Sequence, residues 1–408
     1  MKRFLTILVL LTCGICRGQH WSQIYSPTNQ KIFSCSFINQ DTGWIVTANN
    51  IFRTNDGGFS WTNQNYPPDP TGDNRFFNTI QFINPNNGII ACGNYAGPSP
   101  TLSTILWTND GGINWVYKDI GDSDDYEIDA KLVNPNTAFA IGQYGTSKKT
   151  INNATTWTSL GFFSGSGAKL FPINNDTVYF AGVTYVGAST IGIVGKTMDG
   201  GSTWNTYSNP TNIGMQTIYF NDYFNGWVGG FSGEIRYTID AGLNWTLTNT
   251  GVTSCINDLV FTNSTNGWAV TSDGDILNST DAGHNWNIQF TTSTYLTSLS
   301  FSRPNEIGYA VGDSGKIFKY SLNVGFETLT NNVQINIFPN PITNELNIKI
   351  DNYEPAEITL YDLASRKLLQ QTFTNTTTIN TEQLAKGMYL YEVRNRNGII
   401  KNGKVIKE

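Results

Sequence analysis

Carboxylates gather in one short stretch of this 408-residue chain, and carboxylate oxygens are ligands that Ca²⁺ prefers. The acidic residues of the stretch are Asp122, Asp124, Asp125, Glu127 and Asp129, with Tyr126 among them. The stretch lacks the glycine order of an EF-hand loop, so a solvated acidic loop is the alternative interpretation. The sequence therefore leaves one Ca²⁺ site open and indicates no other cofactor.

Side chains for nucleophilic or metal chemistry are sparse. Neither His20 nor His284, the two histidines, has a cysteine or a second histidine at metal-ligand or nucleophile spacing. Once the first 18 residues, which hold Cys13 and Cys16, are removed, the cysteines are Cys35, Cys92 and Cys255. This odd, sparse set is not a disulfide framework, and the expected strand positions of Cys35 and Cys92 indicate buried free thiols. Hydrolysis of a glycosidic bond would need two carboxylates in one pocket, so that activity depends on how the chain folds.

A turn that is repeated along the chain organises the strands that would position these residues. Its pattern is Thr or Ser, any residue, Asp, any residue, Gly, two residues and Trp, with a degenerate copy at 150–157. The Asp can fix a hairpin through backbone N–H groups, the Gly supplies a positive φ, and the Trp packs between sheets. The Asp (or Asn) and Trp positions are Asp56 and Trp61, Asp110 and Trp115, Asn152 and Trp157, Asp199 and Trp204, Asp240 and Trp245, and Asp281 and Trp286.

The spacing of these turns predicts the fold. Consecutive Trp positions lie 41 to 54 residues apart, and each interval holds the pattern of about four short strands, which is typical of a propeller blade. A seventh set of inner strands ends near Tyr320 without a turn, while Trp21 lies 40 residues before Trp61. Residues 21–26 are therefore expected to complete the last blade. The prediction is an all-β, seven-bladed propeller over residues 19–322, closed by an N-terminal strand.

These turns resemble the Asp-box, or BNR, repeats of sialidases and related propellers. The longer unit, which adds a Phe, an Asn-Gly-Trp and a Gly-x-Ile, is similar to the photosystem II assembly/stability factor-like propellers. The resemblance implies that the Asp boxes are structural and lie away from the active face. Sialidases need an arginine cluster, whereas this segment has only Arg53, Arg75, Arg236 and Arg303. Arg53 and Arg236 occupy equivalent third-strand positions, which favours a structural role.

Residues 337–408 resemble the type A C-terminal sorting domain of type IX secretion substrates. Alternating apolar strands predict a small Ig-like β-sandwich there, after a linker over residues 323–336. The residues that carry the resemblance are Pro339, Asn340, Pro341, Gly387 and Tyr389. It implies export through the outer membrane, the type IX machinery as a partner, and a Bacteroidota-type source.

The first 18 residues are predicted to be a signal peptide. Lys2 and Arg3 precede an apolar run over 4–11, which is too short to span a bilayer. A lipoprotein is the alternative, although Thr12 and Ile15 fit a lipobox poorly. The net charge is −6 and becomes more negative once the signal is removed, which argues against nucleic acid as a partner. A secreted or outer-surface location without a transmembrane segment is expected.

The loops that vary in length predict a binding face. They join second to third strands, or blade to blade, on the face opposite the Asp turns, and they lie mainly in the first four blades. Tolerated insertions are the alternative explanation. The candidate residues on this face are Tyr66, Asp73, Arg75, Tyr95, Asp122, Asp124, Asp125, Tyr126 and Tyr185.

Three functions remain open. The first is an exported, non-enzymatic module that binds a glycan or a protein. The second is a secreted glycoside hydrolase with a sialidase-like or xyloglucanase-like propeller. The third is a chaperone-like assembly factor. The photosystem II assembly relatives use a basic face, whereas the body of this chain is acidic, and in this respect it differs from them.

Overall fold

The structure is a computed structural model. It describes residues 19–408 apart from 69–75, 94–103, 121–126, 162–164, 187–188, 209–212, 303–306, 323–334, 351–354, 363–365 and 396–397. The chain divides into two compact units, one formed by Gln19–Leu322 and one that includes Asn323–Glu408. Each unit is described by itself.

Gln19–Leu322 forms seven four-stranded antiparallel sheets. Its strands are β1 (Gln19–Gln23), β2 (Ser34–Phe37), β3 (Gly43–Val46), β4 (Ile51–Thr54), β5 (Thr62–Gln64), β6 (Phe76–Phe82), β7 (Gly88–Gly93), β8 (Thr104–Thr108), β9 (Val116–Asp119), β10 (Glu127–Asn134), β11 (Thr137–Gly142), β12 (Ser147–Thr150), β13 (Thr158–Ser159), β14 (Ser166–Pro172), β15 (Val178–Val186), β16 (Ser189–Thr197), β17 (Asn205–Ser208), β18 (Met215–Phe220), β19 (Gly226–Gly230), β20 (Ile235–Thr238), β21 (Thr246–Leu247), β22 (Ile256–Phe261), β23 (Gly267–Thr271), β24 (Asp275–Ser279), β25 (Asn287–Thr291), β26 (Leu296–Ser302), β27 (Ile307–Gly312) and β28 (Ile317–Leu322).

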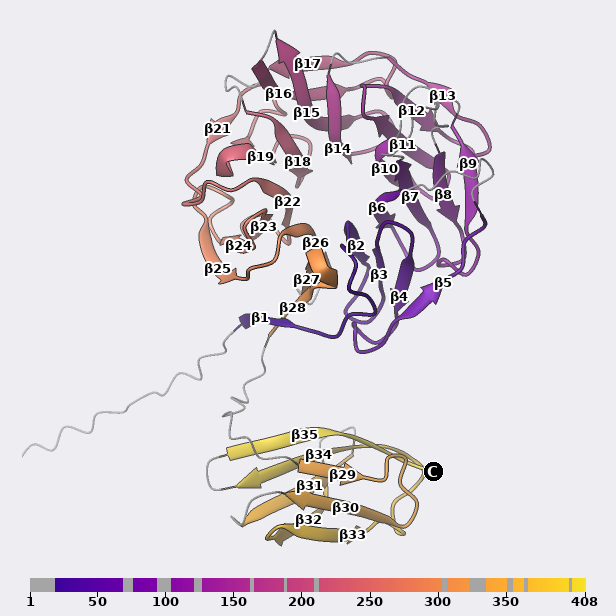
Figure 1. The fold of residues 1–408 in the computed structure, drawn as a ribbon, viewed down its shortest axis with the longest axis vertical. Helices are drawn as coiled ribbons and strands as arrows, with labels where there is room; N and C mark the ends of the chain where they lie inside the picture. The colour runs from indigo at the N-terminus through magenta and orange to yellow at the C-terminus, as the bar shows by residue number, and fades with distance from the viewer. Residues whose placement is uncertain are drawn as a thin grey trace, which may run out of the picture. The chain divides into compact units, whose positions relative to one another are not determined.

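The sheets follow one another around a central space, as Figure 1 shows. The first strand of each sheet contacts the first strand of the next, in the order β2, β6, β10, β14, β18, β22, β26 and back to β2. Six sheets consist of four consecutive strands, whereas the seventh takes its outer strand from the start of the chain. There β1 pairs with β28, with Trp21 opposite Tyr320. The strand spans Gln19–Gln23, slightly earlier than the expected 21–26.

A three-ring aromatic stack recurs between neighbouring sheets. Trp227 on β19 stacks on Phe261 of β22 at 3.7 Å, and Phe261 meets the Asp-turn Trp286 edge-on at 5.8 Å. Trp268, Phe301 and Trp21 repeat this order, with Trp21 in the place of the missing turn residue. Such pairs contribute about 0.5–1.5 kcal/mol each beyond the area they bury. The N-terminal Trp21 therefore packs as the equivalent of the Asp-turn tryptophans.

A glycine makes room for the first-strand Phe ring in five of the sheets. A Cβ at Gly226 would lie 2.4 Å from the ring of Phe220, and one at Gly267 would lie 2.6 Å from Phe261. The same close approach is found for Gly43, Gly88 and Gly308, under Phe37, Phe82 and Phe301. In these sheets the glycine of the second strand is thus a packing requirement, because the Phe ring lies directly over the backbone.

The C-terminal unit has two sheets around one core. Sheet order is β29-β30-β33 in one and β32-β31-β34-β35 in the other. The buried residues of both sheets, among them Ile348, Ile358 and Val393, form a single cluster. Its first strand starts at Ile335, inside the expected linker. The strands are β29 (Ile335–Phe338), β30 (Glu345–Ile350), β31 (Ala356–Tyr361), β32 (Lys367–Phe373), β33 (Thr376–Asn380), β34 (Gly387–Asn395) and β35 (Gly398–Lys407).

The all-β class is confirmed. Helical structure in the described residues is limited to two 3-10 turns, η1 (Phe231–Gly233) and η2 (Asp313–Gly315). Across the part of the chain that the structure describes, no helix has the length and apolar character needed to cross a membrane.

The aromatic stack predicts that two tryptophans differ in how much they contribute to the stability of the fold. Trp286→Ala is expected to lower the free energy of unfolding by about 3–5 kcal/mol, because the side chain is buried and its loss leaves a cavity. Trp245→Ala should cost less, since Trp245 is partly exposed. Urea unfolding of residues 19–408 measures both. An unchanged midpoint for Trp286→Ala would contradict the packing role.

Candidate functional site

The Asp turns are closed hydrogen-bond units. In the turn at 238–245, Asp240 Oδ1 accepts the Thr238 hydroxyl at 2.8 Å and the Asn244 N–H at 2.9 Å, while Oδ2 accepts Asn244 Nδ2 at 2.7 Å. The Thr238 hydroxyl also accepts the Gly242 N–H at 3.0 Å. In the degenerate turn, Asn152 Oδ1 accepts the Thr156 N–H at 3.0 Å, so the amide keeps the same role.

Each turn also anchors the preceding sheet. Trp227 Nε1 donates to the carbonyl of Ala282 at 3.0 Å, and the Tyr179 hydroxyl donates to that of Ala241 at 3.2 Å. Tyr309 of the last sheet donates to Gly57 in the first turn at 3.2 Å, which joins the two ends of the ring. The Asp and Trp residues of these turns therefore have a structural role.

Hydrogen bonds hold the turn carboxylates ionised. The side-chain hydroxyl and backbone N–H of Thr203, together with the Thr197 hydroxyl, lower the pKa of Asp199 to about 2. Donors aimed at a carboxylate favour its charged form. The turns thus use their Asp residues as fixed acceptors, not as acid–base groups near neutral pH.

A polar network links the inner strands at the centre of the ring. Asp258 on β22 accepts the Leu299 N–H from β26 at 3.0 Å and the Thr217 hydroxyl from β18 at 3.2 Å. Lys169 of β14, two sheets away, reaches the same carboxylate at 3.3 Å. Burial lowers the pKa of Lys169 and the Asp258 and Asp129 carboxylates raise it, with a net upward shift. The ammonium and its carboxylate partner therefore connect four adjacent inner strands, β14, β18, β22 and β26.

The face opposite the Asp turns carries a pocket. In an antiparallel four-stranded sheet, links between second and third strands and links between sheets lie on the opposite face from the third-to-fourth turns; we call it the loop face. A cavity of about 580 Å³ opens there between the sheets β22–β25 and β26–β28 with β1. Polar surface predominates in its lining. The lining residues are Ser272, Asp273, Ser293, Thr294, Tyr295, Asp313, Ser314 and Lys316.

Backbone hydrogen bonds fix the three segments that form the pocket. The Thr292 N–H donates to the Gly274 carbonyl at 3.0 Å, which ties the β25–β26 link to the turn at 272–274. The Asp313 N–H donates to the Tyr295 carbonyl at 2.9 Å, which ties η2 to the same link. A Cβ at Gly274, where φ is +94°, would lie 2.0 Å from the Thr292 carbonyl oxygen, so this approach requires glycine. The pocket walls are therefore preorganised.

Several polar side chains of the pocket are unengaged. Within the described part of the chain, the side chains of Asp273, Ser293 and Ser314 make no hydrogen bond or ion pair. By contrast, Asp313 Oδ1 pairs with Lys31 Nζ at 3.2 Å, and that ammonium lies 4.5 Å from the centroid of the Tyr295 ring. The pocket thus offers free acceptors and donors beside an aromatic ring.

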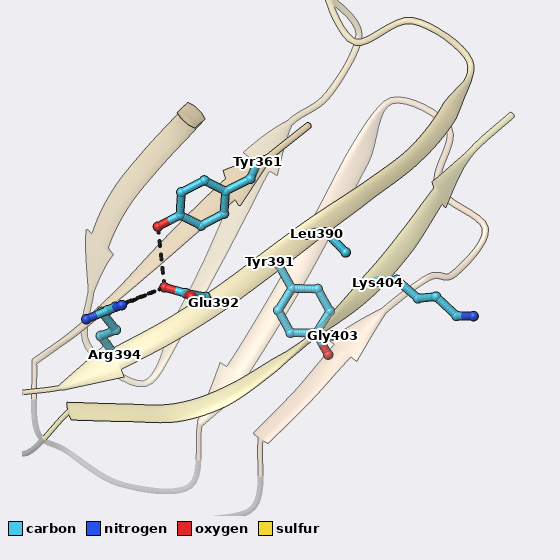
Figure 2. Close-up of a pocket in the computed structure, with 7 residues that line it drawn as sticks. All are labelled: Tyr361, Leu390, Tyr391, Glu392, Arg394, Gly403 and Lys404. Carbon is cyan, nitrogen blue, oxygen red and sulfur yellow. Dashed lines mark hydrogen bonds and ion pairs between the residues drawn. The ribbon is translucent and has the colours of Figure 1, made fainter. Parts of the chain in front are cut away.

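A second cavity lies in the C-terminal unit. It has a volume of about 520 Å³ and is lined by residues of β31, β34 and β35 (Figure 2). Glu392 Oε2 accepts Arg394 Nη2 at 2.8 Å and the Tyr361 hydroxyl at 3.3 Å, as Figure 2 shows. Because the Glu392 carboxylate already accepts hydrogen bonds from these neighbours, this cavity is a weaker candidate for a ligand site than the loop-face pocket.

Most of the predicted binding residues lie outside the described residues. Asp73, Arg75, Tyr95, Asp122, Asp124, Asp125 and Tyr126 belong to this group, and the side chain of Tyr185 on β15 is likewise not described. Tyr66 is described, on the β5–β6 link. Its hydroxyl donates to the Asn49 carbonyl at 2.7 Å and its ring packs edge-on against Phe77 at 5.0 Å. Tyr66 is therefore part of the packing of the loop face.

The sorting-signal residues gather around one end of β35. Asn340 Oδ1 accepts the Ile406 N–H at 2.9 Å, and Asn340 lies between Pro339 and Pro341, both preceded by cis peptide bonds. Gly387 pairs with Lys407 and has a φ of +152°. Tyr389 is buried and donates its hydroxyl to the Ala385 carbonyl at 2.7 Å.

The remaining candidates have local roles. His284 stacks on Tyr237 at 4.6 Å, and Arg236 pairs with Glu234 at 3.1 Å. Burial raises the pKa of the Cys35 thiol to about 12 and that of Cys255 to about 11, and the three cysteines of the described residues are free thiols. Among the described residues no cluster of three His, Cys, Asp or Glu side chains could hold a metal ion. The predicted Ca²⁺ stretch lies largely outside these residues.

Sequence reasoning missed both the central network and the loop-face pocket. The pocket loops have ordinary lengths, so loop-length variation did not point to them. One signal was present: a Ser-Asp-Gly at 272–274 and an Asp-Ser-Gly at 313–315 occupy the same second-to-third strand position in neighbouring repeats.

The fold and the turns define an Asp-box β-propeller followed by an export domain. The family model described as photosynthesis system II assembly factor YCF48 matches residues 15–321, and the chain belongs to this family. The model of the secretion system C-terminal sorting domain matches residues 336–408. No curated protein matches the chain.

Solved structures show the same fold. YCF48 from Cyanidioschyzon merolae is 18% identical with a TM-score of 0.60, covering 74% of this chain and 99% of its own. YCF48 bound to D1 peptide is 22% identical with a TM-score of 0.61, covering 74% and 96%. The WD40 propeller domain of Doa1 is 9% identical with a TM-score of 0.61, covering 76% and 98%.

The turn carboxylates make acid sensitivity testable. Because the pKa of Asp199 is lowered when folded, its stabilising effect is complete above the ordinary pKa near 3.8 and is lost as pH falls toward 2. Asp199→Asn should therefore reduce the fall in melting temperature between pH 5 and pH 2. The reciprocal Asn152→Asp should increase it. Parallel curves for both variants and the parent would contradict this.

The central network predicts a large effect at Asp258. Asp258→Ala leaves Lys169, the Thr217 hydroxyl and the Leu299 N–H without their acceptor, and should cost about 3–5 kcal/mol in urea unfolding. The double variant Lys169→Met with Asp258→Ala should recover part of this loss, because it removes the unpaired ammonium. A cost below about 1 kcal/mol would show that the network is not needed.

Proposed function

We propose that this chain is an exported, non-enzymatic binding module: a seven-bladed propeller, closed by β1, that presents its ligand site on the loop face. A signal peptide over residues 1–18 takes it to the periplasm, and the Ig-like C-terminal domain, after a linker from residue 323, delivers it through the type IX machinery. The sorting-domain match supports this route and a secreted or outer-surface destination. The Bacteroidota-type source follows from the same resemblance.

The loop-face pocket is the observation that carries the binding role. Its walls are fixed by backbone hydrogen bonds, so ordering them costs little when a ligand binds. Asp273, Ser293 and Ser314 line it with unengaged polar atoms, which is typical of a site that takes its missing partners from a ligand. The ligand is a glycan or a protein; YCF48 bound to D1 peptide is an example of a peptide ligand in the family.

A second candidate is a glycoside hydrolase. Asp273 and Asp313 line one pocket, as a pair of catalytic carboxylates would. The ion pair between Asp313 and Lys31 favours binding over catalysis, because it holds that carboxylate as a fixed charge. Hydrolysis of neutral polysaccharides that Asp273→Asn abolishes would establish the enzyme instead.

Export is tested by deleting residues 336–408 in a host with a type IX system. We expect the full chain at the cell surface or in the medium, and the shortened chain in the periplasm. The full chain in a host that lacks the type IX machinery is the matched control and should also stay in the periplasm. Equal release of the full and shortened chains would contradict the proposal.

A further inference from the structure

We infer that the loop-face pocket between the last two sheets binds a neutral carbohydrate, through the hydroxyl groups of one or two sugar units. This inference rests on the proposed binding function and assigns its ligand class. It places the site not in the variable loops of the first four sheets but in the links of the last two sheets, which have ordinary lengths.

The polar lining matches hydroxyl groups. A sugar hydroxyl both donates and accepts, and so do the hydroxyls of Ser272, Ser293 and Ser314, while Asp273 is an acceptor for two neighbouring donors. A carboxylate acceptor forms stronger hydrogen bonds than a neutral one. Since Asp273 has no partner among the described residues, two adjacent sugar hydroxyls would satisfy it without competition from the protein.

An aromatic ring supplies the apolar contact. Tyr295 is 39% exposed, and Lys31 Nζ lies 4.5 Å from its ring centroid. The Tyr295 hydroxyl is tied to Asn257 Oδ1 at 3.4 Å, which fixes the direction of the ring. A fixed, partly exposed aromatic side chain offers contact area at low entropic cost, and the C–H groups of a sugar ring suit such a surface.

The charges of the pocket balance one another. The Lys31 ammonium is matched by the Asp313 carboxylate. Lys316 Nζ donates to the neutral Gln23 Oε1 at 3.3 Å and keeps its positive charge, while Asp273 supplies one negative charge. The pocket therefore has no net charge with which to select an acidic or a basic ligand, which fits a neutral one.

The chain contains a matched control for the pocket. Ser314 in η2 and Ser232 in η1 occupy the same position in two sheets, with φ of +55° and +58°. Ser232 is not among the lining residues. Ser314→Ala and Ser232→Ala therefore make the same change in the same backbone, once inside the pocket and once outside. Asp176 lies in a hairpin on the Asp-turn face, so Asp176→Ala serves as the control for Asp273→Ala.

The experiment uses residues 19–408 on two arrays. One carries neutral gluco-, manno-, galacto- and xylo-oligosaccharides, and the other carries decapeptides of varied charge. We expect binding to at least one neutral oligosaccharide family, with affinity lowered at least tenfold by Asp273→Ala and by Tyr295→Ala, and severalfold by Ser314→Ala. Ser232→Ala and Asp176→Ala should bind like the parent. Melting temperatures within about 3 °C of the parent, which is roughly the shift that a 1 kcal/mol change produces, qualify each variant as folded.

The outcomes separate the inference from the function it rests on. Peptide binding that Asp273→Ala and Tyr295→Ala abolish, without sugar binding, would overturn the carbohydrate inference and leave the binding pocket standing. Sugar binding that the pocket variants leave unchanged would place the site elsewhere and overturn the inference. Binding on neither array would overturn both.

Discussion

The ring depends on one contact repeated between neighbouring sheets. An aromatic side chain of a second strand, such as Trp227, stacks on the first-strand Phe of the next sheet and donates to a carbonyl in that sheet's Asp turn. A buried indole N–H without an acceptor would be costly, so the turn must hold its carbonyl in place. The Asp, Gly and Trp of the turns at 54–61, 108–115, 238–245 and 279–286 serve this requirement. Tyr309 and Gly57 make the same contact between the last sheet and the first, and β1 adds the final strand.

A rigid ring explains why the two faces differ. The Asp-turn face is committed to these inter-sheet bonds, and the centre is occupied by the Asp258 network. On the loop face, the described side chains of Asp273, Ser293 and Ser314 are available to a ligand. The pocket between the last two sheets combines fixed walls with unengaged polar groups. The propeller fold serves many functions, so the ligand of a particular propeller is set by a local site of this kind.

The repeat made much of the fold predictable. The regular spacing of the turn tryptophans and the position of Trp21 predict the sheets and the β1–β28 pairing, because each of these Trp residues marks the outer strand of one sheet. The Lys169–Asp258 contact was not predictable, since its partners are 89 residues apart and belong to no shared motif. The pocket was missed for a different reason: loops of constant length can still bring Asp273, Tyr295 and Ser314 together. Most of the binding residues predicted from variable loops lie outside the described residues and stay predictions.

The central claim is that a ligand binds the loop face between the last two sheets. Hydrogen–deuterium exchange of residues 19–408, with and without the oligosaccharide that binds on the array, tests it most directly. We expect slower exchange at 272–274, 293–295 and 313–316, with no change in the Asp turns. Slower exchange confined to the Asp turns, or to the C-terminal unit, would contradict it.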